Sequence, residues 1–119
     1  MKFVLDTNAA TYLLGGQLAV ALPFGHYGVS VISEIELLSY PSLAPGEETA
    51  IQRLLTSVRR LPLDEAVRDR TIALRREHSL KLPDAVIAAT AINWGATLLS
   101  NDSRLSRIPA LATQTLALK

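Results

Sequence analysis

Residues 1–14, MKFVLDTNAATYLL, change from a strand pattern to a helix pattern at an acidic residue. Lys2–Leu5 is short and apolar, as expected of a buried strand, and Asn8–Leu14 has the composition of a short helix that a pair of glycines ends. Asp6 stands close to the point where one pattern gives way to the other. A carboxylate at the end of a buried strand either caps the next helix or belongs to a functional site, and this stretch alone is evenly balanced between the two.

The alternation of strands and helices continues along the chain. Further strands are predicted at Tyr27–Ile32, Arg60–Leu63, Ala96–Leu99 and Thr113–Leu118, and further helices at Ser33–Tyr40, Pro45–Val58, Asp64–His78 and Pro83–Gly95. Pro62 makes the strand that contains it a weak or edge strand, and Asp64 is the expected N-cap of the long helix, with Leu63, Val67 and Leu74 on one side. This order predicts an α/β domain with a mostly parallel, helix-covered sheet.

Length and composition narrow the class of protein. The chain has 119 residues, 49% of them hydrophobic, and shows no repeat or linker, so residues 1–119 are expected to form one domain. The absence of cysteine excludes disulfides, zinc–thiolate sites and a cysteine nucleophile. A net charge of +1 neither predicts nor excludes a nucleic-acid partner.

No membrane or export signal is visible in the sequence. The longest uncharged helical stretch, Ala85–Gly95, is well below the ~20 residues that a membrane span needs. The first residues also lack the pattern of a signal peptide. We therefore expect a soluble, cytoplasmic protein without a membrane partner.

Four of the eleven acidic residues occupy unusual places, whereas most of the others fit solvated helix faces. Asp6 and Asp102 follow predicted strands, Glu36 lies in SEIELLSY just after the second strand, and Asp84 lies near the start of the helix in KLPDAVIAATA. These positions are what distinguishes the four acids from the rest.

Each of the four also has an ordinary structural explanation. Asp6 can cap the following helix, and Glu36 can form a capping box with Ser33 in the pattern S-x-x-E. Asp84 follows a proline at a helix start, where its charge complements the helix dipole. Asp102 in an Asn-Asp-Ser stretch is common turn chemistry.

Taken together, the four positions favour a site. The carboxyl ends of parallel strands meet at one edge of a sheet, and a helix that leads into a strand begins at that same edge. Four carboxylates gathered there repel one another unless a proton or cation intervenes. With no lysine expected beside them and no soft ligands, an all-oxygen site suits Mg²⁺ or Mn²⁺, which support phosphoryl-transfer chemistry.

The four motifs in this order resemble a known family. DTN at residues 6–8, the ELLSY segment at 36–40, LPDAVIAATA at 82–91 and LLSND at 98–102 are similar to those of PIN-domain ribonucleases, and more narrowly of VapC-type toxins from type II toxin–antitoxin systems. The resemblance covers nearly the whole chain. It implies a three-layer α/β/α sandwich and a metal-dependent endoribonuclease.

The resemblance also implies roles for individual residues. The acids that would hold Mg²⁺ or Mn²⁺ and carry out catalysis are Asp6, Glu36, Asp84 and Asp102. Glu34 competes for the second position, but the acid directly before Leu-Leu matches the family better. Asn8 and Ser100 match polar positions that support the acids, and Leu105 stands where the family often has an aromatic residue.

The implied reaction is hydrolysis of an RNA phosphodiester by a water that the metal site activates. One carboxylate, for which Glu36 is the candidate, could act through a water instead of binding metal directly. Lys81, Arg104 and Arg107 are candidate phosphate contacts, and solvated surface charge explains each of them equally well. The family further implies a VapB-like antitoxin that inserts a segment into the active-site groove, and a homodimer.

Three other functions remain open from the sequence. A phosphatase of the haloacid dehalogenase type is disfavoured, since it requires a second aspartate where this chain has Asn8. A receiver-like phosphoacceptor module is disfavoured because Asp6 is not part of an acidic pair. A PIN-fold nuclease that processes RNA without an antitoxin stays possible, and a small antitoxin gene directly upstream would argue against it.

Overall fold

A five-stranded sheet forms the centre of the computed structural model, which describes all residues 1–119. The strands are β1 (Lys2–Leu5), β2 (His26–Ser30), β3 (Arg59–Leu61), β4 (Thr97–Leu99) and β5 (Thr113–Gln114). Their order is β3-β2-β1-β4-β5, and every neighbouring pair is parallel. The predicted parallel sheet is therefore confirmed, and β3, with Pro62 directly after it, is an edge strand as expected.

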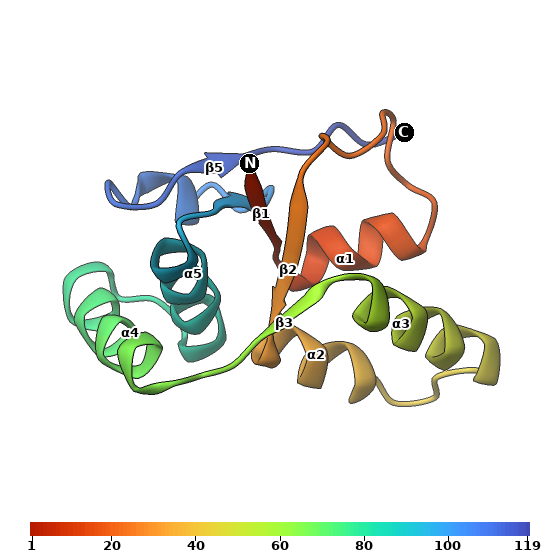
Figure 1. Cartoon of the computed structure of the whole chain (residues 1–119), viewed down its shortest axis with the longest axis horizontal. Coiled ribbons are helices and arrows are strands. Elements are labelled where there is room, and N and C mark those ends of the chain that lie inside the picture. Colours follow the sequence, from red (N-terminus) through yellow and green to blue (C-terminus); the bar gives the residue numbers. More distant parts are fainter.

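Helices cover both faces of this sheet (Figure 1). They are α1 (Thr7–Leu14), α2 (Val31–Leu38), α3 (Pro45–Ser57), α4 (Glu65–His78) and α5 (Leu82–Trp94), with a 3₁₀ turn η1 (Leu105–Arg107) after β4. In the view of Figure 1, α1 and α3 lie to one side of the strands and α4 and α5 to the other. The predicted three-layer α/β/α sandwich is confirmed.

Alternation along β1 builds one core on each face of the sheet. Phe3 and Leu5 belong to the cluster under α1 and α3, whereas Val4 belongs to the cluster under α4 and α5. Helix α5 is buried from Ala85 to Ala91 without interruption. Since most of these residues are alanines, the helix can pack closely against both the sheet and α4.

Several boundaries differ from the sequence-based prediction. The strand predicted at Tyr27–Ile32 ends at Ser30, because the Ser30 side chain caps α2 and accepts a hydrogen bond from the backbone N–H of Ile32 at 3.1 Å. The last strand is only two residues long, because β4 ends at Leu99, the residue that pairs with Gln114. Leu118 instead forms an isolated antiparallel bridge with Leu18.

The start of the long helix is partly as predicted. Asp64 does cap α4, accepting a hydrogen bond from the N–H of Val67 at 2.9 Å. Val67 and Leu74 are buried, but Leu63 lies before the helix and is 44% exposed, so its predicted place on the apolar side was wrong.

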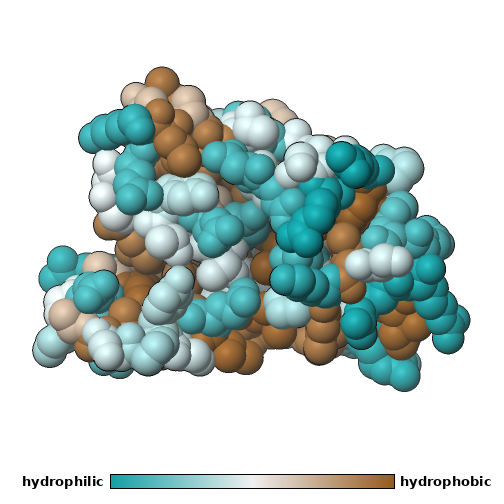
Figure 2. Space-filling model, turned by 180° about the vertical axis from the view of Figure 1, so that it is seen from behind, coloured by the Kyte–Doolittle hydropathy of each residue, from teal (hydrophilic) through white to brown (hydrophobic).

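The lower edge of the sheet in Figure 1 is the carboxyl edge, where α1 and α2 begin directly after β1 and β2. Both chain ends lie at the opposite, upper side. Seen from behind, hydrophobic residues reach the surface along this lower edge (Figure 2). Ile35 of α2 is among the exposed hydrophobic residues. No helix is both long enough and apolar enough to cross a membrane.

Candidate active site

A pocket of about 390 Å³ opens at the carboxyl edge of the sheet. All four acids singled out in the sequence line it, and each comes from a different segment of the chain. The complete lining is Asp6, Thr7, Asn8, Glu36, Ser39, Tyr40, Pro41, Asp84, Ile87 and Asp102. The parallel topology thus brings together carboxylates that are up to 96 positions apart, from residue 6 to residue 102.

Asp6 both caps α1 and lines the acidic pocket, which are the two roles that the sequence left open. Its Oδ1 accepts a hydrogen bond from the N–H of Ala9 at 2.7 Å and so caps α1. It also lies in the acidic pocket, where its side chain is buried. Burial raises the pKa of Asp6, and repulsion from Asp84 and Asp102 adds to the rise, while the neighbouring Ser100 hydroxyl opposes it.

Glu36 points toward the start of α1. The hydroxyl of Thr7 donates a hydrogen bond to Glu36 Oε1 at 2.6 Å and lies 3.0 Å from the hydroxyl of Ser33. Ser33 is fully buried inside α2 rather than at its N-cap, so the predicted capping box between Ser33 and Glu36 was wrong. The hydrogen bond from Thr7 holds Glu36 against the pocket instead.

Glu34, the competitor for this position, lies elsewhere. It forms an ion pair with Arg60 of β3 at 3.0 Å and does not line the acidic pocket. The structure therefore places Glu36, and not Glu34, with the other three acids.

Asp84 lies in the first turn of α5, whose first residue is Leu82 rather than the predicted Pro83. Burial raises the pKa of the Asp84 carboxyl, and the charges of Asp102 and Glu36 raise it further. Arg104 and Lys81 act in the opposite direction. Burial and repulsion from the neighbouring acids together outweigh the effect of the two cations on the pKa of Asp84.

Asp102 is bound tightly by a neighbouring arginine. Arg104 Nε lies 3.1 Å from Asp102 Oδ1 and Arg104 Nη2 lies 2.7 Å from Oδ2, so the contact is bidentate. The backbone N–H of Arg104 also donates to Oδ1 at 2.9 Å, which is the turn chemistry expected of this stretch. These hydrogen bonds hold the pKa of Asp102 below its ordinary value.

The same guanidinium lies 3.6 Å from Asp84 Oδ2. Arg104 is one of the phosphate contacts expected from the sequence, but its ion pairs with Asp84 and Asp102 were not predicted. Arg104 is two positions from Asp102, and that spacing was the available signal.

The remaining candidates are placed as follows. Asn8 lines the pocket, and the buried Ser100 hydroxyl accepts a hydrogen bond from the N–H of Asp102 at 3.1 Å. Lys81 is the residue before α5, and its charge lowers the pKa of Asp84 and Asp102 without lining the pocket. Arg107 is exposed on η1 and contacts none of the acids. Leu105 is buried in the core, where it packs against α5.

The donor set suits a hard divalent cation. It consists of four carboxylates without sulfur or imidazole, and repulsion between these carboxylates contributes to the raised pKa of Asp6 and Asp84. As the side chains stand, no three acidic side chains are close enough together to hold one ion. Arg104 contacts both oxygens of Asp102, so a cation bound at this carboxylate would compete with that contact.

The fold and this acidic pocket define an α/β protein with a carboxylate site at the carboxyl edge of a parallel sheet. A family model described as the PIN domain matches residues 3–111. The chain belongs to the PIN domain family, as its motifs suggested. This membership sets aside the phosphatase and receiver-like alternatives.

Solved structures of similar fold agree with this assignment. A chain in the structure of VapBC2 from Rickettsia felis bound to a promoter DNA fragment superimposes with a TM-score of 0.82 at 20% identity, covering 98% of this chain and 99% of that one. A chain of DNA-bound VapBC from Salmonella typhimurium gives a TM-score of 0.81 at 22% identity, with coverages of 97% and 98%.

A third similar structure has a higher sequence identity. A chain of a toxin–antitoxin complex from Klebsiella pneumoniae is 26% identical, with a TM-score of 0.72 and coverages of 92% and 95%. Comparison with the curated proteins gives no match.

Several pocket residues were not assigned a role from the sequence. Thr7 stands inside the DTN motif and its hydrogen bond to Glu36 explains why a hydroxyl is useful there. Tyr40 and Pro41 belong to the linker after α2 and also line the pocket. The ELLSY segment contained the signal for Tyr40, but only the folded linker shows that its ring stays at the surface.

Proposed function

We propose that this protein is a metal-dependent endoribonuclease and the toxin of a toxin–antitoxin pair. The observation that carries the proposal is the convergence of Asp6, Glu36, Asp84 and Asp102 on one pocket of a PIN domain. The solved structures of similar fold include VapBC complexes and another toxin–antitoxin complex, which supports the choice of partner. A PIN nuclease without an antitoxin remains the alternative.

In this proposal the four carboxylates hold Mg²⁺ or Mn²⁺, and bound metal supplies charge neutralisation and an acidified water for phosphodiester hydrolysis. Asp6 is fixed by its cap hydrogen bond and Glu36 by Thr7, so both carboxylates are already oriented before metal or substrate binds. Glu36, held from one side by a hydroxyl, is suited to accept a proton from the attacking water.

Arg104 is the cation nearest to the acids and is the candidate for contacting the phosphate. Its guanidinium makes a bidentate contact with Asp102, and this geometry would equally suit a phosphate oxygen pair of the substrate. Lys81 is the second candidate, since its charge reaches the same two aspartates. Arg107 has no contact with the site, and its role as a phosphate contact rests on the resemblance alone.

Cleavage of total RNA by the purified protein tests the proposal. We expect discrete products with Mg²⁺ or Mn²⁺, none with EDTA, and none from the variants Asp6→Asn and Asp84→Asn. Asp69→Asn is the matched control, because Asp69 is an exposed acid of α4 that pairs only with its neighbour Arg68. Equal cleavage by wild type and the pocket variants would mean that the acids are structural.

The partner and the oligomer need separate measurements. Co-expression with the small gene directly upstream should yield a stable complex in which RNA cleavage is suppressed. Light scattering of the free protein should give the mass of a homodimer. A monomer without an upstream partner would favour the RNA-processing alternative. An RNA substrate would be met in the cytoplasm, so no export step is required.

A further inference from the structure

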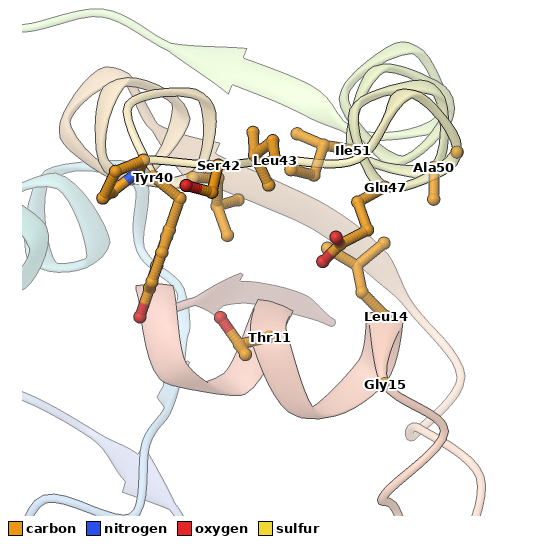
Figure 3. Close-up of a pocket in the computed structure, with 12 residues that line it drawn as sticks. Thr11, Leu14, Gly15, Tyr40, Ser42, Leu43, Glu47, Ala50 and Ile51 are labelled. Carbon is orange, nitrogen blue, oxygen red and sulfur yellow. The ribbon is translucent and has the colours of Figure 1, made fainter.

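A second cavity adjoins the acidic pocket and is not explained by the proposed chemistry. It has a volume of about 480 Å³ and lies between α1, the linker after α2 and the start of α3 (Figure 3). Half of its twelve lining residues are hydrophobic, among them Leu14, Leu43 and Ile51. Its size falls in the range of ~300–1,000 Å³ typical of small-ligand pockets.

The two cavities adjoin each other. Tyr40 and Pro41 line both of them, so the linker forms the boundary between the acidic and the apolar side. Figure 3 shows the Tyr40 ring extending from this linker toward α1, near Thr11, at one end of the apolar cavity. Any chain bound at the carboxylates would pass this ring as it leaves in that direction.

Tyr40 is unusually open for a tyrosine beside an apolar cavity. The residue is 61% exposed, and its hydroxyl makes no hydrogen bond within the protein. The hydroxyl of a buried tyrosine usually finds a hydrogen-bond partner, and that of the half-buried Tyr27 donates to the carbonyl of Pro23 at 2.6 Å. The exposed ring therefore offers a free aromatic face at the mouth of the cavity.

The linker that carries this ring is conformationally constrained. Ser42 has a φ of 65°, in the left-handed region that residues with a Cβ seldom adopt. Such strain is retained where the surrounding structure demands it, often at binding sites. Pro41 precedes Ser42, and the capped start of α3 follows it. Both restrict the conformation of the linker that carries Tyr40.

The charge of the lining residues indicates which chemical groups the apolar cavity can bind. None of its lining residues is basic, and one, Glu47, is acidic. A phosphate group would be repelled, whereas a nucleobase presents apolar faces and a polar edge that Ser42 and Glu47 can meet at the rim. The adjoining carboxylates supply the place where the phosphate is handled.

We propose that Tyr40 is a stacking platform for an unpaired RNA base next to the cleaved phosphate, and that the apolar cavity receives this base. The inference rests on the proposed nuclease function and adds to it a binding position for one base of the RNA substrate. Bases stacked in a duplex cannot reach such a ring, so paired RNA is excluded from the site. Stacking on one aromatic ring contributes about 1–3 kcal/mol per base.

Binding of labelled RNA tests the platform without relying on cleavage. The background is the Asp84→Asn variant, and the probe is a fluorescein-labelled, single-stranded RNA of about 12 nucleotides, within the site sizes of ~4–16 nucleotides known for single strands. Anisotropy titrations compare Tyr40→Ala and Tyr40→Phe in that background. Tyr40→Ala should weaken binding roughly 5- to 100-fold, and Tyr40→Phe less than about 2-fold, because phenylalanine keeps the aromatic face.

An abasic ribose–phosphate chain of the same length separates stacking from other effects. It should bind weakly and with the same affinity to Tyr40→Ala and to the parent, since no base is present to stack. Phe24→Ala is the matched control: Phe24 is a fully exposed aromatic residue outside both cavities, and its loss should leave RNA affinity unchanged. Thermal melts of each variant show that the fold is intact.

Two results would overturn the platform while leaving the nuclease in place. One is wild-type RNA cleavage together with unchanged RNA affinity in Tyr40→Ala. The other is equal loss of affinity for the normal and the abasic chain. Loss of binding only to the antitoxin protein would assign the cavity to that partner and also overturn the inference. Absence of any metal-dependent cleavage by the wild type would remove the proposed function, and the platform with it.

Discussion

Arg104 binds both carboxylate oxygens of Asp102, at 3.1 and 2.7 Å, and its Nη2 lies 3.6 Å from Asp84. One guanidinium thus contacts two of the four acids of the pocket. The same contact lowers the pKa of Asp102, whereas the pKa of Asp84 stays raised. Arg104 therefore stabilises the charge of Asp102 more than that of Asp84, and a cation bound at Asp102 would compete with it.

This competition predicts that Arg104→Gln binds divalent metal more tightly than the wild type. Removing one positive charge from a solvent-exposed site should increase the affinity for Mn²⁺ about 3- to 10-fold. Calorimetric titration of the free protein with Mn²⁺ measures this directly. Arg107→Gln, which removes an exposed arginine without contact to the acids, is the matched control. Weaker metal binding by Arg104→Gln would contradict the competition.

The hydrogen bond between Thr7 and Glu36 predicts a positioning role for Thr7. Thr7→Val keeps the shape of the side chain but loses the 2.6 Å hydrogen bond to the carboxylate. Loss of such a supporting contact typically lowers metal affinity or activity about 10- to 100-fold. The Mn²⁺ affinity and the rate of RNA cleavage should both fall in Thr7→Val and recover in Thr7→Ser. Equal effects of the two substitutions would assign Thr7 to packing.

The raised pKa of Asp84 predicts that its charge destabilises the metal-free protein. A carboxyl whose pKa is higher in the folded than in the unfolded state costs stability while it is ionised, and this cost disappears as the pH falls through the folded pKa toward 3.8. In EDTA at neutral pH, Asp84→Asn should raise Tm by about 2–5 °C, the scale of stabilising changes at functional sites.

The difference in Tm between Asp84→Asn and wild type should shrink as the pH is lowered, because the wild-type carboxyl becomes protonated. Asp102 behaves in the opposite way. Its lowered pKa contributes stability above 3.8 that is lost as the pH falls through the folded value. Scanning calorimetry at a series of pH values from neutral to below 3.8 separates the contributions of the Asp84 and Asp102 carboxyls to stability. A constant difference in Tm for Asp84→Asn would show that its charge is not the cause.

The packing around Gly28 leaves no room for a side chain at this position of β2. A Cβ at this position would lie 2.7 Å from Leu61 Cδ1 and 2.9 Å from Trp94 Cζ3. Gly28→Ala should therefore destabilise the fold by about 1–3 kcal/mol, through overpacking between β3 and α5. Urea unfolding gives the change. Gly46→Ala, where a Cβ would meet nothing within 4 Å, is the control and should leave the stability nearly unchanged.

The sequence by itself determined the α/β class and the identity of the four acids. An apolar strand that ends on Asp6, a helix that begins near Asp84 and a strand followed by Asp102 are local patterns. The rule that parallel strands share a carboxyl edge is enough to bring such residues to one place. The caps of α1 and α4 were likewise readable, because a cap is a contact between residues three positions apart.

Only the tertiary structure decided which residues hydrogen-bond to the acids of the pocket and which side chains lie beside them. Ser33 satisfies the capping-box pattern with Glu36, yet Ser30 caps the helix and Thr7, on another element, holds Glu36. Arg104 contacts Asp84 although they are 20 positions apart, and the ring of Tyr40 is exposed because the linker folds between two cavities. These relationships depend on distances between separate segments, and local periodicity carries no information about such distances.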